Sequence, residues 1–253
     1  MNDKKNMHIG VVQMHLSTDI VQNTQKILCF MKQASERGID LLCFPECSLT
    51  GYIVDHYKIR MDDIKEAISA IRKASDKHNI SAIVGTSWHH NNKNGNDKNK
   101  KIKKIIYNSA VVIRPHSKIK LYFKNDLTDY DKNYFSKGDS TIKFRIKNIN
   151  CGVLICRDQN NPLLAAKYRN NIDILFYLSS HYYTKSEALR KERKNKAFPI
   201  VRAIENKIYV AKADAVGKQN GFVNFGGSIV VDPGGEVIAE GRKGKEQILE
   251  FYL

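Results

Sequence analysis

The sequence predicts an α/β fold in which a pair of mixed β-sheets carries helices on its outer sides. Two observations favour it: strand–helix–strand units open the chain, and hairpins mixed with helices follow. At 253 residues the chain is long enough to bury one sizeable core. It shows neither an internal repeat nor a long linker. We therefore expect residues 1–253 to form a single domain.

The first unit is a strand, a helix and a second strand. Residues 8–14 predict the first strand, Ser17 or Thr18 is placed to cap the helix, and Gly38 is placed to end it. Residues 40–45 form a nearly continuous apolar run, which is typical of a strand buried on both faces. This order indicates a βαβ unit.

The later segments alternate between apolar periodicity of the helical kind and short strand-like runs. We expect helices at 62–78, 162–169 and 186–206, strands at 81–86, 105–113, 119–124, 141–146, 151–156, 172–178, 208–214, 227–231, 236–239 and 247–252, and a tight turn at 232–235. The strands at 105–113 and 119–124 are joined by a short Pro-His-Ser turn and predict an antiparallel hairpin.

The net charge of +16 raises the question of nucleic acid, but much of the excess lies in one stretch. Residues 90–104 are rich in Lys and Asn and cannot fill a core, so we interpret them as a surface loop. No nucleic-acid-binding motif accompanies this stretch. Nucleic acid is therefore not an expected partner.

The five cysteines are an odd number in a chain too long to need disulfides. Residues 1–5 are polar, and no apolar run resembles a signal peptide or a membrane span. We expect a cytoplasmic protein with reduced thiols and no membrane partner.

Three chemically useful side chains follow predicted strands. Cys156 ends the apolar run 152–155, Glu46 follows the strand at 40–45, and Lys124 ends the strand at 119–124. Strand ends are where open α/β sheets place their ligands. Each residue also has a simpler interpretation, since cysteines are often buried in cores and lysines are usually solvated.

Five motifs that contain or surround these residues occur in one order along almost the whole chain. They are Phe44-Pro45-Glu46 with Leu49-Thr50-Gly51-Tyr52; Tyr122-Phe123-Lys124 with the segment 134–139; Gly152 to Asp158 with Pro162; Arg202-Ala203-Ile204-Glu205-Asn206; and Phe225-Gly226-Gly227-Ser228 with Asp232-Pro233-Gly234. This ordered set resembles the nitrilase superfamily of carbon–nitrogen hydrolases.

The resemblance implies a four-layer αββα sandwich that pairs through helices into a homodimer or a larger homo-oligomer. It also implies that Cys156 is the nucleophile, Glu46 the general base and Lys124 the group that stabilises the oxyanion. The substrate would be a small amide or nitrile, hydrolysed through a thioester. Such chemistry needs no metal and no organic cofactor.

The chain departs from the family pattern near Lys124. Asp131 stands where many members carry a second glutamate, Asp126 replaces a frequent histidine, and Leu163 replaces a frequent glutamate. We expect Asp131 to orient Lys124 or the substrate, and Asp126 to place a second acid near Lys124. Arg157 has two interpretations: it contacts an oxyanion or acidic substrate, or it pairs outward with an acid.

Three aromatic residues are candidates for the wall of the substrate pocket. They are Tyr52, His181 and Tyr182, and each has the alternative interpretation of an ordinary half-buried aromatic. The sequence thus favours a hydrolase of a small amide or N-carbamoyl compound that releases ammonia or an amine. Nitrile hydrolysis by the same triad is one alternative, and a non-catalytic binding protein on the same scaffold is another.

Overall fold

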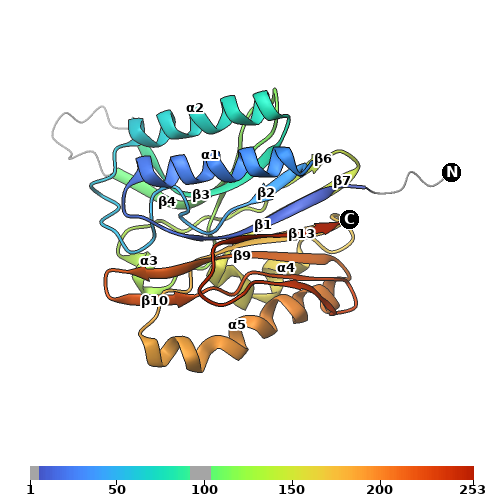
Figure 1. Ribbon diagram of the computed structural model, residues 1–253. Coiled ribbons are helices and arrows are strands. Elements are labelled where there is room, and N and C mark those ends of the chain that lie inside the picture. The colour runs from blue at the N-terminus through green and yellow to red at the C-terminus, as the bar shows by residue number, and fades with distance from the viewer. Residues whose placement is uncertain (1–5, 92–103) are drawn as a thin grey trace.

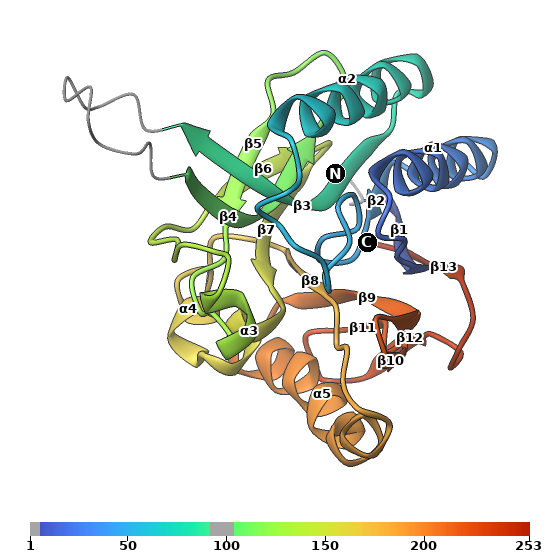
Figure 2. The ribbon, with the colours of Figure 1, turned by 90° about the vertical axis from the view of Figure 1, so that its left-hand side faces the viewer.

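The computed structural model describes residues 6–91 and 104–253. Within them the strands form a strongly curled sheet whose central order is β5-β4-β3-β2-β1-β9-β8-β7-β6. The two halves of this sheet stack on each other, with α1 and α2 outside one half and α4 and α5 outside the other (Figures 1 and 2). This arrangement confirms the predicted mixed α/β fold and fits the αββα layering.

The half of the sheet beneath α1 and α2 is built mainly from the first half of the chain. The elements of this first half of the chain are β1 (His8–His15), α1 (Ile20–Glu36), β2 (Leu41–Cys43), α2 (Met61–His78), β3 (Ser81–Asn91), β4 (Lys104–Ile113), β5 (Lys120–Phe123) and the short α3 (Asp129–Lys132). β3, β4 and β5 pair in antiparallel fashion, which confirms the predicted hairpin. Most of the predicted loop at 90–104 lies outside the described residues.

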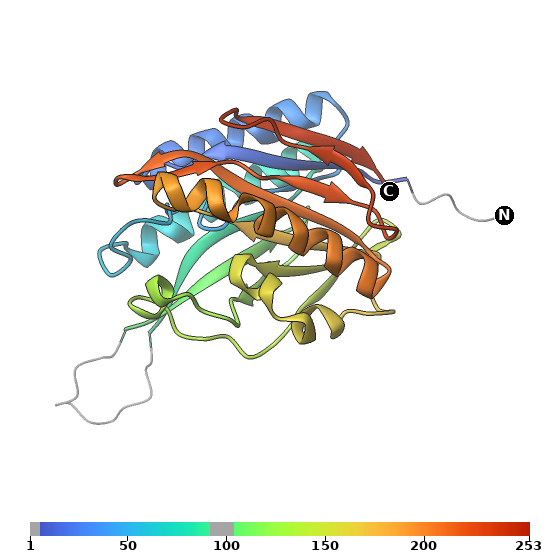
Figure 3. The same cartoon turned by 90° about the horizontal axis from the view of Figure 1, so that it is seen from below.

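Most of the second half of the chain forms the other layer of strands and its helices, which Figure 3 shows from below, whereas its last strand pairs with β1 in the first layer. Its elements are β6 (Lys143–Ile146), β7 (Ile149–Ile155), a 3₁₀ turn (Cys156–Asn160), α4 (Pro162–Ala166), β8 (Ile174–Ser179), α5 (Lys185–Asn206), β9 (Tyr209–Gln219), β10 (Phe222–Phe225), β11 (Ile229–Val231), β12 (Val237–Glu240) and β13 (Gln247–Tyr252). Parallel pairing of β7, β8 and β9 brings their carboxyl ends to one edge.

Some predicted boundaries were wrong. Asp19, rather than Ser17 or Thr18, caps α1, because its carboxylate accepts the Val21 N–H at 2.8 Å while Ser17 bonds to neighbouring side chains. Cys156 does not end a strand but begins the 3₁₀ turn. The strand β10 was not predicted; it extends the sheet by pairing with β9.

The core lies in layers that match the sheet's two faces. One buried cluster fills the space between the halves of the sheet, with Ile9, Ile83 and Val112 from one side and Val153 and Phe176 from the other. A second cluster lies between the first half and helices α1 and α2. None of the helices formed by the described residues has the length and apolar character needed to cross a membrane.

Strand β1 is the seam of the molecule. It pairs in parallel with β2, in antiparallel fashion with β13 along Gln13 to His8, and through its last residues with β9. The first and last strands of the sequence are therefore direct neighbours, and β1 joins the two halves of the sheet.

Candidate active site

The ends of three strands carry the three predicted residues. Glu46 lies in the turn after β2, Lys124 directly follows β5, and Cys156 directly follows β7. The Lys124 Nζ atom lies 2.6 Å from Glu46 Oε1, and both side chains are fully buried. The Cys156 side chain is 7% exposed and lines a cavity of about 240 Å³. Residues far apart in the sequence thus lie near one another: Glu46 and Lys124 are in contact, and both act electrostatically on the Cys156 thiol.

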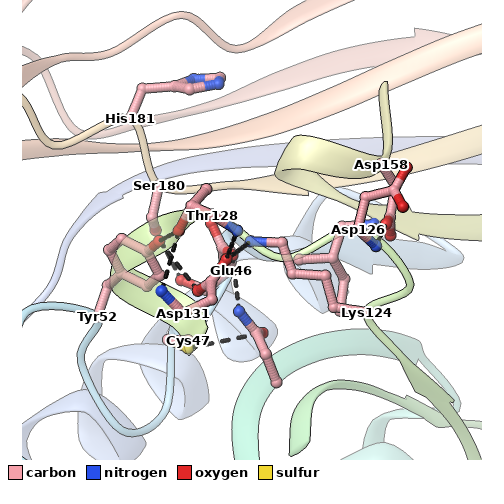
Figure 4. A network of polar contacts seen from close by, with 12 residues as sticks. Glu46, Cys47, Tyr52, Lys124, Asp126, Thr128, Asp131, Asp158, Ser180 and His181 are labelled. Carbon is pink, nitrogen blue, oxygen red and sulfur yellow. Dashed lines mark hydrogen bonds and ion pairs between the residues drawn. The ribbon is translucent and has the colours of Figure 1, made fainter. Parts of the chain in front are cut away.

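Asp131 completes a buried network with Glu46 and Lys124 (Figure 4). Its Oδ2 atom accepts from Lys124 Nζ at 2.8 Å, and its Oδ1 atom accepts from the Tyr52 hydroxyl at 3.1 Å. Asp131 and Thr128 form a capping box at the start of α3, which fixes the carboxylate. The shorter side chain of aspartate therefore still reaches Lys124.

The protonation of this network follows from burial and from the charges in contact. Burial raises the pKa of Glu46 to about 7, although Lys124 lowers it, and Asp131 adds to the rise. For Lys124, burial lowers the pKa, but Glu46 and Asp131 outweigh that effect and hold it above its ordinary value. Lys124 is therefore an ammonium at neutral pH, whereas Glu46 changes its charge near neutrality.

The two oxygens of Glu46 have different surroundings. Oε1 accepts from Lys124 and, at 2.8 Å, from the Asn108 side-chain amide. Oε2 is buried and has no hydrogen-bond partner among the residues that the structure describes. The Glu46 backbone carbonyl is held by the Ser180 hydroxyl at 2.7 Å. One carboxylate oxygen is thus fully used in positioning, and the other is available to take a proton.

Cys156 has an unusual backbone conformation, with a positive φ of 42°. A non-glycine residue in this region carries strain, which is most often found at functional sites. Burial raises the pKa of the thiol, Glu46 adds to the rise, and Lys124 and a backbone hydrogen bond from Ser180 lower it. Because the shift as a whole is upward, the resting thiol is protonated and needs a base before it can attack.

Asp158 ties the Cys156 turn to the loop that carries Lys124. Its carboxylate accepts from the backbone N–H groups of Ile155, Asn125 and Asp126 at 2.7 to 3.1 Å, and from the Tyr122 hydroxyl at 2.7 Å. Burial raises the pKa of Asp158 to about 6. One buried carboxylate therefore fixes the relative positions of two site segments.

The cavity beside Cys156 is lined mainly by aromatic residues. Its lining includes Tyr52, His181 and Tyr182, which are the three residues that the sequence suggested. The His181 ring is held by Asp214, with Nδ1 2.6 Å from Oδ2. The nucleophile candidate therefore lies in a partly apolar pocket of a size that suits a small molecule.

Two expectations near Lys124 need correction. Asp126 is not an ion-pair partner of Lys124, because its described contact is the backbone bond to Asp158. Arg157 is exposed and lines a separate surface depression with Lys132 and Lys137, and it is not among the residues that line the cavity of Cys156. Leu163 is 73% exposed and takes no part in the site.

The model of the carbon–nitrogen hydrolase family matches residues 8–251 of this chain. The chain belongs to the carbon–nitrogen hydrolase family. It thus lies within the nitrilase superfamily, as the motifs indicated.

Curated relatives of this carbon–nitrogen hydrolase differ in their activities. It is 28% identical to a glutamine-dependent NAD(+) synthetase of Thermotoga maritima, over 98% of this chain and 42% of the synthetase. It is 27% identical to a nitrilase of Pyrococcus abyssi (92% and 85%) and 25% identical to a 2-oxoglutaramate amidase of Bacillus subtilis (88% and 81%). The chain spans less than half the length of the synthetases it matches.

Solved structures share the fold of this hydrolase. A carbon–nitrogen hydrolase from Helicobacter pylori superposes with a TM-score of 0.84 at 20% identity, covering 97% of this chain and 88% of that one. A double mutant of the amidase from Nesterenkonia sp. AN1 in complex with acrylamide gives 0.80 at 20% identity, covering 100% and 92%. At this identity the likeness concerns the fold alone.

Sequence reasoning missed several residues of the hydrolase site. Asn108, Thr128, Ser180 and Asp158 all contact the network or hold its segments. Asp158 could have been found from the sequence, because it lies two residues after Cys156 at the end of the Gly152–Asp158 motif. Asn108 carries no such signal, since it is a polar residue within an apolar strand, 62 positions from Glu46.

Proposed function

We propose that the protein is a thiol amidase that hydrolyses a small amide or N-carbamoyl compound through Cys156, Glu46 and Lys124. The observation that carries this proposal is the buried Glu46–Lys124 pair beside the Cys156 cavity, with Glu46 Oε2 left without a partner. A structural ion pair would be expected to satisfy both carboxylate oxygens. A general base needs one oxygen free.

The reaction follows from the positions of these groups. Glu46 takes the proton of the Cys156 thiol, and the sulfur attacks the amide carbon. The Lys124 ammonium stabilises the oxyanion, and protonated Glu46 gives its proton to the departing ammonia or amine. Glu46 then activates a water that hydrolyses the thioester. With a pKa near 7, Glu46 is suited to both accepting and returning a proton.

Positive charge at the cavity favours an amide that also carries an acidic group. Lys191 Nζ lies 4.2 Å from the ring of Tyr183, which lines the cavity. Lys191, Arg157 and Arg190 together lower the pKa of the nearby Lys194, although burial is the larger cause. Lys191 is paired with Glu187 at 2.9 Å, so the excess positive charge here comes from Lys194 and its basic neighbours, and such an excess attracts anionic substrates. The B. subtilis relative is named for 2-oxoglutaramate, an amide that carries a carboxylate.

The test is ammonia release from a panel of small amides, N-carbamoyl compounds and nitriles. We expect wild-type turnover, most readily with ω-amides of short dicarboxylic acids, and loss of turnover in Cys156→Ala with unchanged circular dichroism. Cys29→Ala is the matched control, since Cys29 is exposed on α1 and should keep full activity. Turnover that persists in Cys156→Ala rules out this nucleophile. Turnover of nitriles but not amides favours the alternative reaction.

Thiol reactivity separates an enzyme from a non-catalytic binding protein. In an active site, Glu46 and Lys124 should make Cys156, which is 7% exposed, alkylate faster than the exposed Cys29 as well as faster than Cys43 and Cys151, which are fully buried. Glu46→Gln should abolish this advantage. Equal alkylation rates for the buried cysteines would support the binding protein instead.

A further inference from the structure

The side chain of Asn108 is a neutral donor buried inside a charged network. Asn108 lies on β4, is fully buried, and donates through Nδ2 to Glu46 Oε1 at 2.8 Å. We propose that Asn108 is a positioning residue for the reaction, which fixes Glu46 so that Oε2 is the oxygen that exchanges protons. This inference rests on the proposed function.

The Glu46 carboxylate is held asymmetrically. Oε1 receives two donors, Asn108 at 2.8 Å and Lys124 at 2.6 Å, whereas Oε2 receives none from the described part of the chain. If Lys124 were the only donor, rotation of the Glu46 carboxylate group would allow either of its oxygens to accept the hydrogen bond from the Lys124 ammonium. The second donor comes from a different strand, so the two donors together hold one orientation.

The side-chain amide of Asn108 is itself fixed. The Cys47 thiol lies 3.8 Å from Asn108 Oδ1, where it donates, so the amide nitrogen must face the carboxylate. The Asn108 backbone carbonyl accepts the Lys124 N–H at 2.9 Å. Asn108 therefore holds the backbone of Lys124 and the side chain of Glu46 at the same time.

Asn108 also acts on Glu46 electrostatically. A neutral donor to the charged form lowers the pKa of Glu46 without adding charge, whereas burial and Asp131 raise it. The titratable groups that influence or contact Glu46 are Lys124, Asp131, Cys47, Tyr52, Cys156 and Tyr183. Among the neutral side chains of the described residues, Asn108 is the donor to this carboxylate.

The experiment measures kcat/KM against pH for wild type and for Asn108→Ala. We expect the acid limb, which reports Glu46, to move upward by about one pH unit, because the charged carboxylate loses a hydrogen bond. At pH 6 the variant should be about tenfold slower, with KM nearly unchanged. Asn108→Leu, which keeps a similar volume but removes the donor without adding charge, should shift the limb in the same direction. This second variant replaces Asn108→Ala in the test if the alanine variant does not fold.

Two controls make the outcome specific. Ser109→Ala removes a buried hydroxyl that bonds to the Tyr107 carbonyl, away from Glu46, and should leave the acid limb in place. Difference infrared spectroscopy in a Cys156→Ala background reads the protonation of Glu46 without turnover, and the Asn108→Ala change should raise its midpoint there as well. A lower rate with an unmoved acid limb and infrared midpoint would overturn the inference. A wild type that is inactive on all substrates would overturn the proposed function instead, while the infrared midpoint still tests the inference.

Discussion

Replacing Asp131 by asparagine should make Glu46 more acidic. The change keeps the shape of the side chain but removes a negative charge that contacts the same ammonium as Glu46. The nearest carboxylate oxygens of Glu46 and Asp131 lie 2.6 and 2.8 Å from Lys124 Nζ. Those oxygens are therefore at most about 5.5 Å apart.

The size of the effect follows from that separation. Two like charges at about 5.5 Å repel by about 3 kcal/mol at an effective dielectric constant of about 20. This energy corresponds to about two pH units. Because Asp131 raises the pKa of Glu46, which lies at about 7, its neutralisation should lower that pKa towards about 5. Glu46 would then stay charged over a wider range of pH, but it would be a weaker base.

The assay is ammonia release against pH, together with urea unfolding. We expect the acid limb of kcat/KM to shift downward, the plateau rate to fall, and the free energy of unfolding to drop by about 2 kcal/mol through the lost charged hydrogen bonds. Asp129→Asn is the matched control, since Asp129 is fully exposed on the same helix and should change neither quantity. An acid limb that stays in place or moves upward would show that Asp131 does not act on Glu46 electrostatically.

Two further substitutions test how the site is held. Asp158→Asn should lower the free energy of unfolding by about 2 to 4 kcal/mol in urea titration, because three backbone N–H groups and a hydroxyl lose a charged acceptor. A wild-type urea midpoint would contradict that role. Gly85→Ala should reduce kcat/KM by about 100-fold in the ammonia assay, because a Cβ there would lie 2.4 Å from the backbone of Pro45 and Cys47 and would displace Glu46. Normal turnover in this variant would mean that the turn adapts without moving its carboxylate.

Most of the fold could be predicted because the strands and helices are strongly patterned. The buried strand β2 and the amphipathic helix α2 show clear periodicity, and their predicted positions are close to the observed ones. Strand β10 was missed because it has only four residues, whose burial runs from the exposed Phe222 to the buried Asn224 without a clear pattern, and because it follows the sharp turn at Asn220 and Gly221. The pairing of β10 with β9 depends on tertiary contacts, which the local sequence does not determine.

The candidate site was only partly predictable. Glu46, Lys124 and Cys156 stand at strand ends inside ordered motifs, so their grouping could be expected. Asn108 could not, because its role depends on the register of β3 and β4 relative to the turn after β2. The side-chain direction of Arg157 likewise depends on the 3₁₀ turn, which replaces the predicted last strand residue.

The pairing of β1 with β13 has a consequence for the order of folding. Residues Gln13 and Gln247 lie opposite each other in the pairing of β1 with β13. This pairing can form only after more than two hundred further residues have been synthesised. Contacts of such long sequence separation are slow to form, because a large loop must close first. During synthesis the edge of β1 is therefore open to other chains until the last strand emerges. We expect chaperone dependence to track this interval rather than the stability of the finished protein.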